Sequence, residues 1–383
     1  MKIRKKKIGV ITLCNSINFG GTLQAYALYK ALNKIGLNPT LIKYQKPIIA
    51  WNSIGQYLRL RKRLYGVNII RMAGGCLKTL FSNIHFFQKK KKIERFVKFR
   101  NSNLIMTPYY KEYKDLVELG NCFDGYITGS DQVWNIEYTN NKFDPAYMLE
   151  FVDSNKPCFS YAASVGGDKD REYLVNLMNK TRKFRMISVR ENSLAKKLNE
   201  LGEKRVFCHI DPVFLLSKTE WKTIEIKPNK KIPNHYILIY YIEMNPKKDI
   251  LIDKILKTMN LPIIDISSYG IIGDMRFIHD REAGPGEFVY YIRHADFVVT
   301  NSFHAVAFSV IFNINFLAVP RCGQESRVRD FLEDIGLQHR ILKENQWEPL
   351  LETIFLDENI LSDQIRKAYD YLREIRNIIN ENN

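Results

Sequence analysis

Residues 297–320 read FVVTNSFHAVAFSVIFNINFLAVP and contain no Asp, Glu, Lys or Arg. The run is long enough to span a bilayer, but Asn301 and His304 interrupt it, and each would be costly in lipid. Its β-branched ends and apolar middle instead predict buried strands at 297–300 and 316–319 on either side of a helix. A strand–helix–strand unit of this kind is typical of a parallel α/β sheet.

The same alternation of short β-branched runs with helical periodicity extends along most of the 383 residues and predicts an α/β protein. A polar segment at 227–234 separates two such sets. The sequence therefore predicts two Rossmann-like domains, residues 1–226 and residues 235–383, the second with a terminal helix. Further strands are expected at 8–12, 40–44, 123–128, 158–162, 186–190, 236–242 and 262–266, and further helices at 22–35, 192–201, 247–259 and 287–294.

The formal net charge is +17, from 58 Lys and Arg against 41 Asp and Glu. Residues 2–7 contain five basic residues and no acid, and residues 59–100 contain thirteen basic residues against one acid. These excesses of five and twelve account for all seventeen charges, so the rest of the chain is balanced. A uniformly basic, histone-like protein is therefore excluded.

The second basic stretch belongs to a predicted insert at about 52–100 in the first domain. Between residues 60 and 87, apolar side chains recur at three- and four-residue spacing, which predicts an amphipathic helix. Such a basic helix suits an anionic membrane surface, or it packs on the core and leaves a solvated basic face. We do not expect nucleic acid as a partner, because the insert lacks regular aromatic stacking positions and any recognised binding motif.

The cysteines and the N-terminal sequence indicate the cellular compartment in which the protein is expected. Six cysteines are widely spaced, with no CxxC pair and no Cys/His cluster, so neither a disulfide framework nor a metal site is expected. The start, MKIRKKKIGVITLC, is basic and then apolar as in a signal peptide, but polar residues follow at once and no small-residue cleavage pattern appears. We interpret it as a basic tail before the first strand, in a cytoplasmic protein.

Candidate binding residues follow the predicted strands, because loops at the carboxyl ends of parallel strands line the ligand crevice. The first loop, NSINFGGT at 15–22, contains Asn18, Gly20 and Gly21. Its glycines let backbone N–H groups approach an anion or a sugar at a helix N-terminus. The loop lacks the dinucleotide pattern GxGxxG, and a plain glycine-rich turn is the alternative.

The second loop, YITGSDQVWN at 126–135, combines a small hydroxyl, a carboxylate and an aromatic ring at a strand exit. This mixture suits carbohydrate: Ser130 and Asp131 can hydrogen-bond to sugar hydroxyls, and Trp134 can offer a stacking face. A Ser-Asp capping turn with a core tryptophan explains the same residues.

The third loop, TNSFHA at 300–305, is the most informative. Asn301 or Ser302 suits the N-cap of the helix, which places His304 in the first turn. Free backbone N–H groups there attract phosphate or carboxylate, and a histidine in a crevice is a candidate for proton transfer.

Two arginines are placed at the predicted edge of the crevice. Arg190 closes a strand, and Arg327 lies beyond the last core strand. A guanidinium can bind a carboxylate or phosphate through two hydrogen bonds, although pairing with the neighbouring Glu191 or Asp330 is the ordinary alternative.

Taken in order, these stretches resemble the motifs of the polysaccharide pyruvyl transferase family. The resemblance covers most of the chain apart from the basic insert and the terminal helix. It departs from the family at Gly20-Gly21, where many members carry a Gly-Asp pair. The matching stretches are NFGG at 18–21, GYITGSDQVW at 125–134, SYAAS at 160–164, SVRE at 188–191, DPV at 211–213, AD at 295–296, TNSFH at 300–304 and RVRDFL at 327–332.

The resemblance implies a fold like that of the two-domain GT-B glycosyltransferases, with the acceptor on the N-terminal side and the donor on the C-terminal side. It also implies transfer of the enolpyruvyl group of phosphoenolpyruvate onto a sugar as a ketal, with release of phosphate. Phosphoenolpyruvate is then a co-substrate, and neither a cofactor nor a metal is expected. The resemblance implies catalysis by His304 and donor binding by Arg190 and by Arg327, with Arg329 as the alternative to Arg327. We also expect donor binding by Asn301 and Ser302, and acceptor binding by Asn18, Gly20, Gly21, Ser130, Asp131 and Trp134.

In the implied reaction, His304 supplies or relays the proton that the enol carbon receives. The expected acceptor is a lipid-linked precursor of a surface polysaccharide, which would place the protein at the inner face of the membrane, with residues 59–100 against anionic lipid. Two other functions stay open on the residues alone. One is a nucleotide-sugar glycosyltransferase on the same architecture, and the other is a non-catalytic sugar-binding protein.

Overall fold

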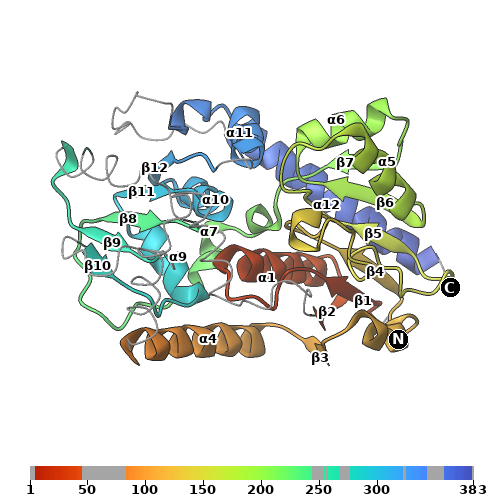
Figure 1. The fold of residues 1–383 in the computed structure, drawn as a ribbon, viewed down its shortest axis with the longest axis horizontal. Helices are drawn as coiled ribbons and strands as arrows, with labels where there is room; N and C mark the ends of the chain where they lie inside the picture. Colours follow the sequence, from red (N-terminus) through yellow and green to blue (C-terminus); the bar gives the residue numbers. More distant parts are fainter. Residues whose placement is uncertain are drawn as a thin grey trace, which may run out of the picture.

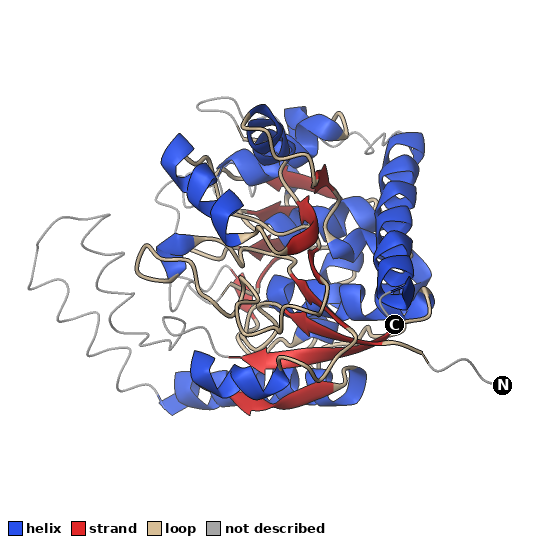
Figure 2. Cartoon of the chain, turned by 90° about the vertical axis from the view of Figure 1, so that its right-hand side faces the viewer, coloured by secondary structure: helices blue, strands red, loops and turns tan. Residues whose placement is uncertain are grey.

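The computed structural model describes residues 5–44, 83–243, 254, 258–267, 277–321, 325–342 and 358–381. Two parallel sheets lie side by side, one built from each half of the chain (Figure 1). Seen from the side, helices flank the strands on both faces (Figure 2). This is the predicted α/β architecture of two Rossmann-like units.

The first sheet has the strand order β3-β2-β1-β4-β5-β6-β7, and its neighbouring strands are parallel. The central strands are buried, as expected for a sheet with helices on both faces. The strands are β1 (Lys7–Ile11), β2 (Asn38–Tyr44), β3 (Met106–Tyr110), β4 (Gly125–Thr128), β5 (Cys158–Ser160), β6 (Phe184–Val189) and β7 (Val206–Cys208).

The second sheet has the order β10-β9-β8-β11-β12 and is also parallel. The stretch 297–320 forms β11, α10 and β12, and every residue of α10 is buried, so the predicted strand–helix–strand unit is confirmed. The strands are β8 (Ile237–Tyr240), β9 (Ile263–Asp265), β10 (Phe277–His279), β11 (Phe297–Thr300) and β12 (Asn315–Ala318).

The helices connect and cover these strands, and no described helix is both long and apolar enough to cross a bilayer. They are α1 (Phe19–Lys34), α4 (Asn83–Asn103), α5 (Arg171–Lys180), α6 (Asn192–Glu200), α7 (Lys218–Lys222), α9 (Pro285–Arg293), α10 (Phe303–Phe312), α11 (Glu325–Asp334) and α12 (Glu358–Glu381). Short 3-10 turns are η1 (Tyr113–Leu119), η2 (Ile136–Tyr138), η3 (Pro212–Leu215) and η4 (Gln338–Arg340).

Three strands were not predicted from the sequence: β3, β7 and β10. Each is three to five residues long and lies at the edge of its sheet, and none has a fully buried run. Edge strands lack the continuous apolar pattern that marks a buried strand. The predicted helix at 247–259 lies almost entirely outside the described residues.

The terminal helix α12 crosses back to the first sheet. Tyr371 Oη donates a hydrogen bond to the carbonyl of Ser160 in β5 at 2.8 Å, and Arg376 Nη1 donates to the carbonyl of Ile35 at 3.1 Å. The polar segment 227–234 separates the last strand of one sheet from the first strand of the other. The division into residues 1–226 and 235–383 stays a prediction.

Helix α4 is the described part of the basic insert, of which residues 52–82 lie outside the described residues. Its inner side packs on the body: the Phe96 ring stacks on Phe19 with centroids 5.3 Å apart, and Arg95 Nη1 lies 3.1 Å from Glu287 Oε1 in α9. Lys92 is buried with Nζ 4.6 Å from the Phe19 ring centroid, and burial lowers the pKa of Lys92 to about 8.

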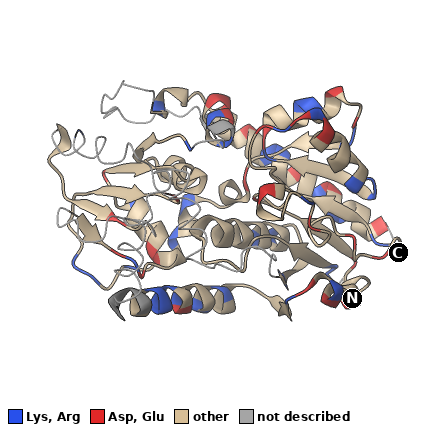
Figure 3. Ribbon diagram, in the orientation of Figure 1, with Lys and Arg blue, Asp and Glu red and all other residues tan. Residues whose placement is uncertain are grey.

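Most of the remaining basic residues of α4 face water, whereas Arg100 is buried and its Nη1 donates to the carbonyl of Ser16 at 3.0 Å. Lys89, Lys90 and Lys98 are exposed, and basic residues recur along the described part of the helix (Figure 3). The described part therefore fits a helix packed on the core with a solvated basic face.

Candidate active site

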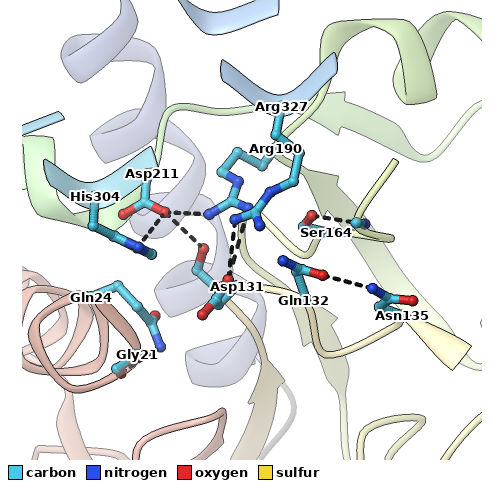
Figure 4. Close-up of polar contacts among 12 residues, drawn as sticks. Gly21, Gln24, Asp131, Gln132, Asn135, Ser164, Arg190, Asp211, His304 and Arg327 are labelled. Atoms are coloured by element: carbon cyan, nitrogen blue, oxygen red, sulfur yellow. Dashed lines mark hydrogen bonds and ion pairs between the residues drawn. The ribbon is translucent and has the colours of Figure 1, made fainter. Parts of the chain in front are cut away.

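The loops that follow the strands of both sheets meet in one buried polar cluster (Figure 4). Asp131 follows β4, Arg190 follows β6, and Asp211 lies between β7 and η3. His304 lies in the first turn of α10 and Arg327 in α11, so the second half of the chain supplies one titratable ring and one guanidinium. The predicted residues Asp131, Arg190, His304 and Arg327 are thus brought together.

Asp211 lies between His304 and Arg190. Its Oδ2 is 2.7 Å from Arg190 Nη1 and 3.5 Å from His304 Nε2. The Asp211 side chain is 0% exposed, so this carboxylate has no water contact of its own. A single oxygen therefore links the arginine of one half of the chain to the histidine of the other.

Two further carboxylates balance the arginines. Asp131 Oδ1 lies 3.3 Å from Arg327 Nη2 and 3.8 Å from Arg190 Nη2. Glu191 Oε1 lies 3.7 Å from Arg190 Nε and 4.0 Å from Arg327 Nε, and it also accepts a hydrogen bond from Ser164 Oγ. Two guanidinium groups thus share three carboxylates.

The aromatic ring of Phe303 supports both guanidinium groups. The Cζ atom of Arg190 is 4.5 Å from the ring centroid, and that of Arg327 is 5.7 Å away. Cation–π contacts at these distances hold the arginines without using their N–H donors. Arg190 Nη1 donates to Asp211 and Arg327 Nη2 donates to Asp131, and the other guanidinium donors stay available for a ligand.

The opposite charges in the cluster shift the pKa values of its ionisable side chains. Burial alone would raise the pKa of Asp131 and of Asp211, but the positive charges of His304, Arg190 and, for Asp131, Arg327 outweigh it and lower both. Burial and the neighbouring Arg190 lower the pKa of Arg327 to about 10, which still leaves it charged at neutral pH. The two aspartates and both arginines are therefore ionised under physiological conditions.

Several donors in the cluster have no hydrogen bond. They are Arg190 Nε, Arg190 Nη2 and Arg327 Nε, all of them buried. Arg190, Arg327, Asp211 and Phe303 line a pocket of about 260 Å³. Because buried polar groups in folded proteins are almost always hydrogen-bonded, these open donors indicate a site for a small ligand with several acceptor oxygens.

Gly20 lies directly against the histidine. A Cβ atom on Gly20 would lie 2.0 Å from His304 Nδ1, so only glycine fits between the start of α1 and the imidazole. The sequence placed Gly20 among the acceptor residues and did not reveal this contact. The two residues are far apart in the chain and come together only when the two sheets pack side by side.

Trp134 does not have the role that was predicted for it. Its side chain is 1% exposed, and its Nε1 donates to the carbonyl of Tyr147 at 3.3 Å. The stacking role is therefore wrong, because neither face of the indole is available to a sugar. The alternative of a core tryptophan is the one that the structure supports.

The other predicted residues hold the loops in place. Asn301 accepts from the backbone N–H of Ile242 at 2.8 Å, and Ser302 caps α10 by accepting from Ala305 N. Asn18 caps α1 by accepting from Gly21 N at 3.0 Å. Their direct binding of donor or acceptor stays a prediction.

Ser130 is also tied into the cluster. Its Oγ donates to the carbonyl of Ala162 at 2.8 Å and lies 3.5 Å from Asp211 Oδ2. Ser130 is fully buried, and its contact with an acceptor likewise stays a prediction.

Sequence reasoning missed Asp211 and Phe303. It considered Glu191 as a partner of Arg190 but missed that Glu191 also lies near Arg327. All three belong to stretches that matched the family motifs, so the motif positions themselves were the available indication. Gln24 was missed as well: its Nε2 donates to Thr12 Oγ1 at 2.7 Å, while its buried Oε1 has no hydrogen bond.

The buried His209 on the pocket wall predicts sensitivity to acid. Burial lowers its pKa to about 4, from 6.5. The unfolded chain therefore binds more protons than the folded one between these values, so stability is lost as the pH falls from about 6.5 towards 4. We expect a loss on the order of 2–3 kcal/mol from this group.

Urea unfolding at pH 7 and pH 4.5 measures this loss, and a His209→Gln variant supplies the control. The variant should show the smaller difference between the two pH values. An equal difference in both proteins would show that His209 does not titrate on unfolding.

The fold places the chain among α/β proteins with two Rossmann-like units of the GT-B kind. The UDP-GlcNAc 2-epimerase from Methanocaldococcus jannaschii aligns with a TM-score of 0.50 at 12% identity, over 96% of this chain and 100% of that one. The UDP-N-acetylglucosamine 2-epimerase from Rickettsia bellii aligns with a TM-score of 0.49 at 14% identity, over 98% and 96%. At such identities the likeness concerns the fold alone.

A family model is more specific. The model of the polysaccharide pyruvyl transferases matches residues 18–323, which covers every residue of the cluster except Arg327. No curated protein sequence matches the chain. The chain belongs to the polysaccharide pyruvyl transferase family.

Proposed function

We propose that this protein transfers the enolpyruvyl group of phosphoenolpyruvate onto a sugar, forms a cyclic ketal and releases phosphate. The observation that supports the proposal is the pair of buried arginines, Arg190 and Arg327, with open N–H donors beside a pocket of about 260 Å³, and with Asp211 joining Arg190 to His304. Phosphoenolpyruvate carries a phosphate and a carboxylate on three carbons. Two guanidinium groups match these two acceptor groups in number and in charge.

The arginines would also stabilise the leaving group. Negative charge accumulates on the phosphate as the C2–O bond breaks, and buried cations favour such charge more strongly than water does. Asp131, Glu191 and Asp211 neutralise the arginines in the absence of donor, so donor binding would exchange carboxylate contacts for phosphate and carboxylate oxygens of the ligand.

In the proposed reaction, His304 delivers a proton to C3 of the enol, and C2 becomes an oxocarbenium-like centre. One sugar hydroxyl attacks C2, the C2–O bond to phosphate breaks, and a second hydroxyl of the same sugar attacks the centre that results. Of the two hydroxyl protons released, one balances the proton gained at C3 and the other leaves on phosphate. The product is a ketal whose C3 is a methyl group.

The direct test incubates the purified protein with phosphoenolpyruvate and synthetic or lipid-linked glycosides. Release of phosphate together with the added mass of a pyruvate ketal on the glycoside is the expected result. Phosphate release without a ketal, or consumption of nucleotide sugars instead, would contradict the proposal and favour a glycosyltransferase.

We further propose that the acceptor is lipid-linked and that α4 faces an anionic membrane. Lys89, Lys90 and Lys98 are exposed, and Phe87 of the same helix is 60% exposed, so the exposed part of α4 combines positive charge with an apolar side chain. Each lysine near an anionic surface contributes about 1 kcal/mol of attraction. Lys91 and Arg95 of α4 instead lie 3.6 and 3.1 Å from Glu282 and Glu287, and Lys92 and Arg100 are buried.

Liposome flotation with anionic lipid tests this face. Replacing Lys89, Lys90 and Lys98 with glutamine should weaken binding by about 100-fold, because roughly 3 kcal/mol of attraction is removed. A matched variant with Lys204, Lys218 and Lys222 replaced by glutamine loses the same charge from exposed positions elsewhere. Equal binding by the two variants would reject the role of α4.

A further inference from the structure

Asp211 contacts both the arginine and the histidine of the proposed reaction. We infer that it is a positioning residue, which orients the imidazole of His304 for proton delivery and Arg190 for the donor. The inference rests on the proposed function and assigns a role to a residue that the reaction itself does not require.

The carboxylate of Asp211 is anchored in the backbone. Oδ1 accepts a hydrogen bond from Val213 N at 3.1 Å and so caps η3, which fixes the carboxylate plane. Oδ2 is thereby directed at Arg190 Nη1 at 2.7 Å and His304 Nε2 at 3.5 Å. Because both oxygens of the Asp211 carboxylate are held and buried, the carboxylate has little freedom to change its orientation.

Two uncharged groups, Gly20 and Phe303, limit the position of the histidine ring. Gly20 leaves no room for a Cβ atom beside Nδ1, and the Phe303 ring meets the imidazole edge-on with centroids 5.3 Å apart. Steric contact thus limits the ring, but a charged partner is needed to select one orientation of its nitrogens. A carboxylate beside an imidazole provides that selection and stabilises the protonated ring.

The other carboxylates of the cluster do not duplicate this role. Asp131 and Glu191 lie within 4.0 Å of Arg190, as Asp211 does. Among the described residues, however, only Asp211 places a carboxylate oxygen within 4.0 Å of a His304 nitrogen. Arg190 therefore has three carboxylates within 4.0 Å, whereas His304 has one, and Asp131 acts on His304 from a longer distance.

This difference predicts that removing the charge of Asp211 lowers kcat without weakening the binding of phosphoenolpyruvate. Asp211→Asn keeps an oxygen for Val213 N and removes the charge. We expect kcat to fall by about 100-fold, because His304 loses its orienting partner. The KM for phosphoenolpyruvate should stay equal or fall, because one negative charge near an anionic donor is gone. Simple loosening of Arg190 would instead raise KM.

Glu191→Gln is the matched control. It removes the same charge from the same arginine, and Glu191 has no contact with His304. We expect a similar change in KM and a much smaller fall in kcat. A fall in kcat as large as that of Asp211→Asn would overturn the inference, because the loss of turnover would then come from the changed charge beside Arg190 and not from the position of His304.

A double-mutant cycle with His304→Ala decides whether Asp211 acts through the imidazole. In the His304→Ala background, Asp211→Asn should change the residual kcat by less than about threefold, since there is no ring left to position. If Asp211→Asn lowers kcat by the same factor in the wild type and in His304→Ala, the inference is overturned.

Asp211→Glu is a second variant in case Asp211→Asn folds poorly. It keeps the charge and displaces it, so the positioning role predicts a clear loss of kcat, and near wild-type turnover would contradict it. A wild-type protein that forms no pyruvate ketal would overturn the proposed function itself, together with this inference. An active wild type with equal factors in the cycle would overturn the inference alone.

Discussion

Replacing Arg190 with methionine is expected to lower the free energy of unfolding by about 3–5 kcal/mol and to remove measurable binding of phosphoenolpyruvate. Arg190 lies within 4.0 Å of Asp131, Glu191 and Asp211, and its side chain is almost fully buried. Without it, the buried carboxylates of Glu191 and Asp211 lose their nearest positive charge. Urea unfolding followed by circular dichroism gives the first quantity, and titration calorimetry gives the second.

The double variant Arg190→Met with Asp211→Asn is the control for this prediction. It removes one of the unpaired carboxylates and should recover part of the lost stability, but not the binding of the donor. An unfolding free energy within 1 kcal/mol of wild type in Arg190→Met alone would show that the cluster does not depend on this arginine.

Replacing Gly20 with alanine is expected to reduce kcat at least about 100-fold and to destabilise the protein by about 1–3 kcal/mol. The new Cβ atom would lie 2.0 Å from His304 Nδ1, far inside van der Waals contact, so the imidazole must leave its place next to Asp211. Ketal formation measures the first effect, and thermal or urea unfolding measures the second.

Gly21 supplies a matched control for Gly20. A Cβ atom on Gly21 would meet the carbonyl oxygen of Leu13 at 2.8 Å, which is backbone and not the histidine. In the His304→Ala background, the stability loss from Gly20→Ala should therefore disappear, while that from Gly21→Ala should persist. Wild-type turnover by Gly20→Ala would refute the steric account of how His304 is held.

The sequence could predict much of the site because its residues lie at the ends of strands. The apolar pattern of 297–320 fixed β11, α10 and β12, and with them the place of His304 at a helix start. Arg190 was recognisable in the same way, at the end of a buried strand. In a parallel sheet, a residue at the carboxyl end of a strand faces the ligand crevice, and this placement does not depend on the details of the tertiary structure.

Other features could not be predicted from local pattern. Trp134 follows a strand just as Asp131 does, yet its ring turns into the core and edge-on to Phe184, with centroids 6.2 Å apart. The burial of Lys92 was equally hidden within a run of four lysines, because only the packing of α4 on α1 decides which lysine turns inward.

By itself, the sequence determined the α/β class, the two sets of strands and the residue types that gather at their ends, because hydrophobic periodicity and glycine placement act over a few residues. Only the tertiary structure decided that Asp211 joins Arg190 to His304 and that Gly20 must lack a side chain. These contacts join separate strands and both halves of the chain. Their distances depend on how the two sheets pack against each other, and no local pattern encodes that packing.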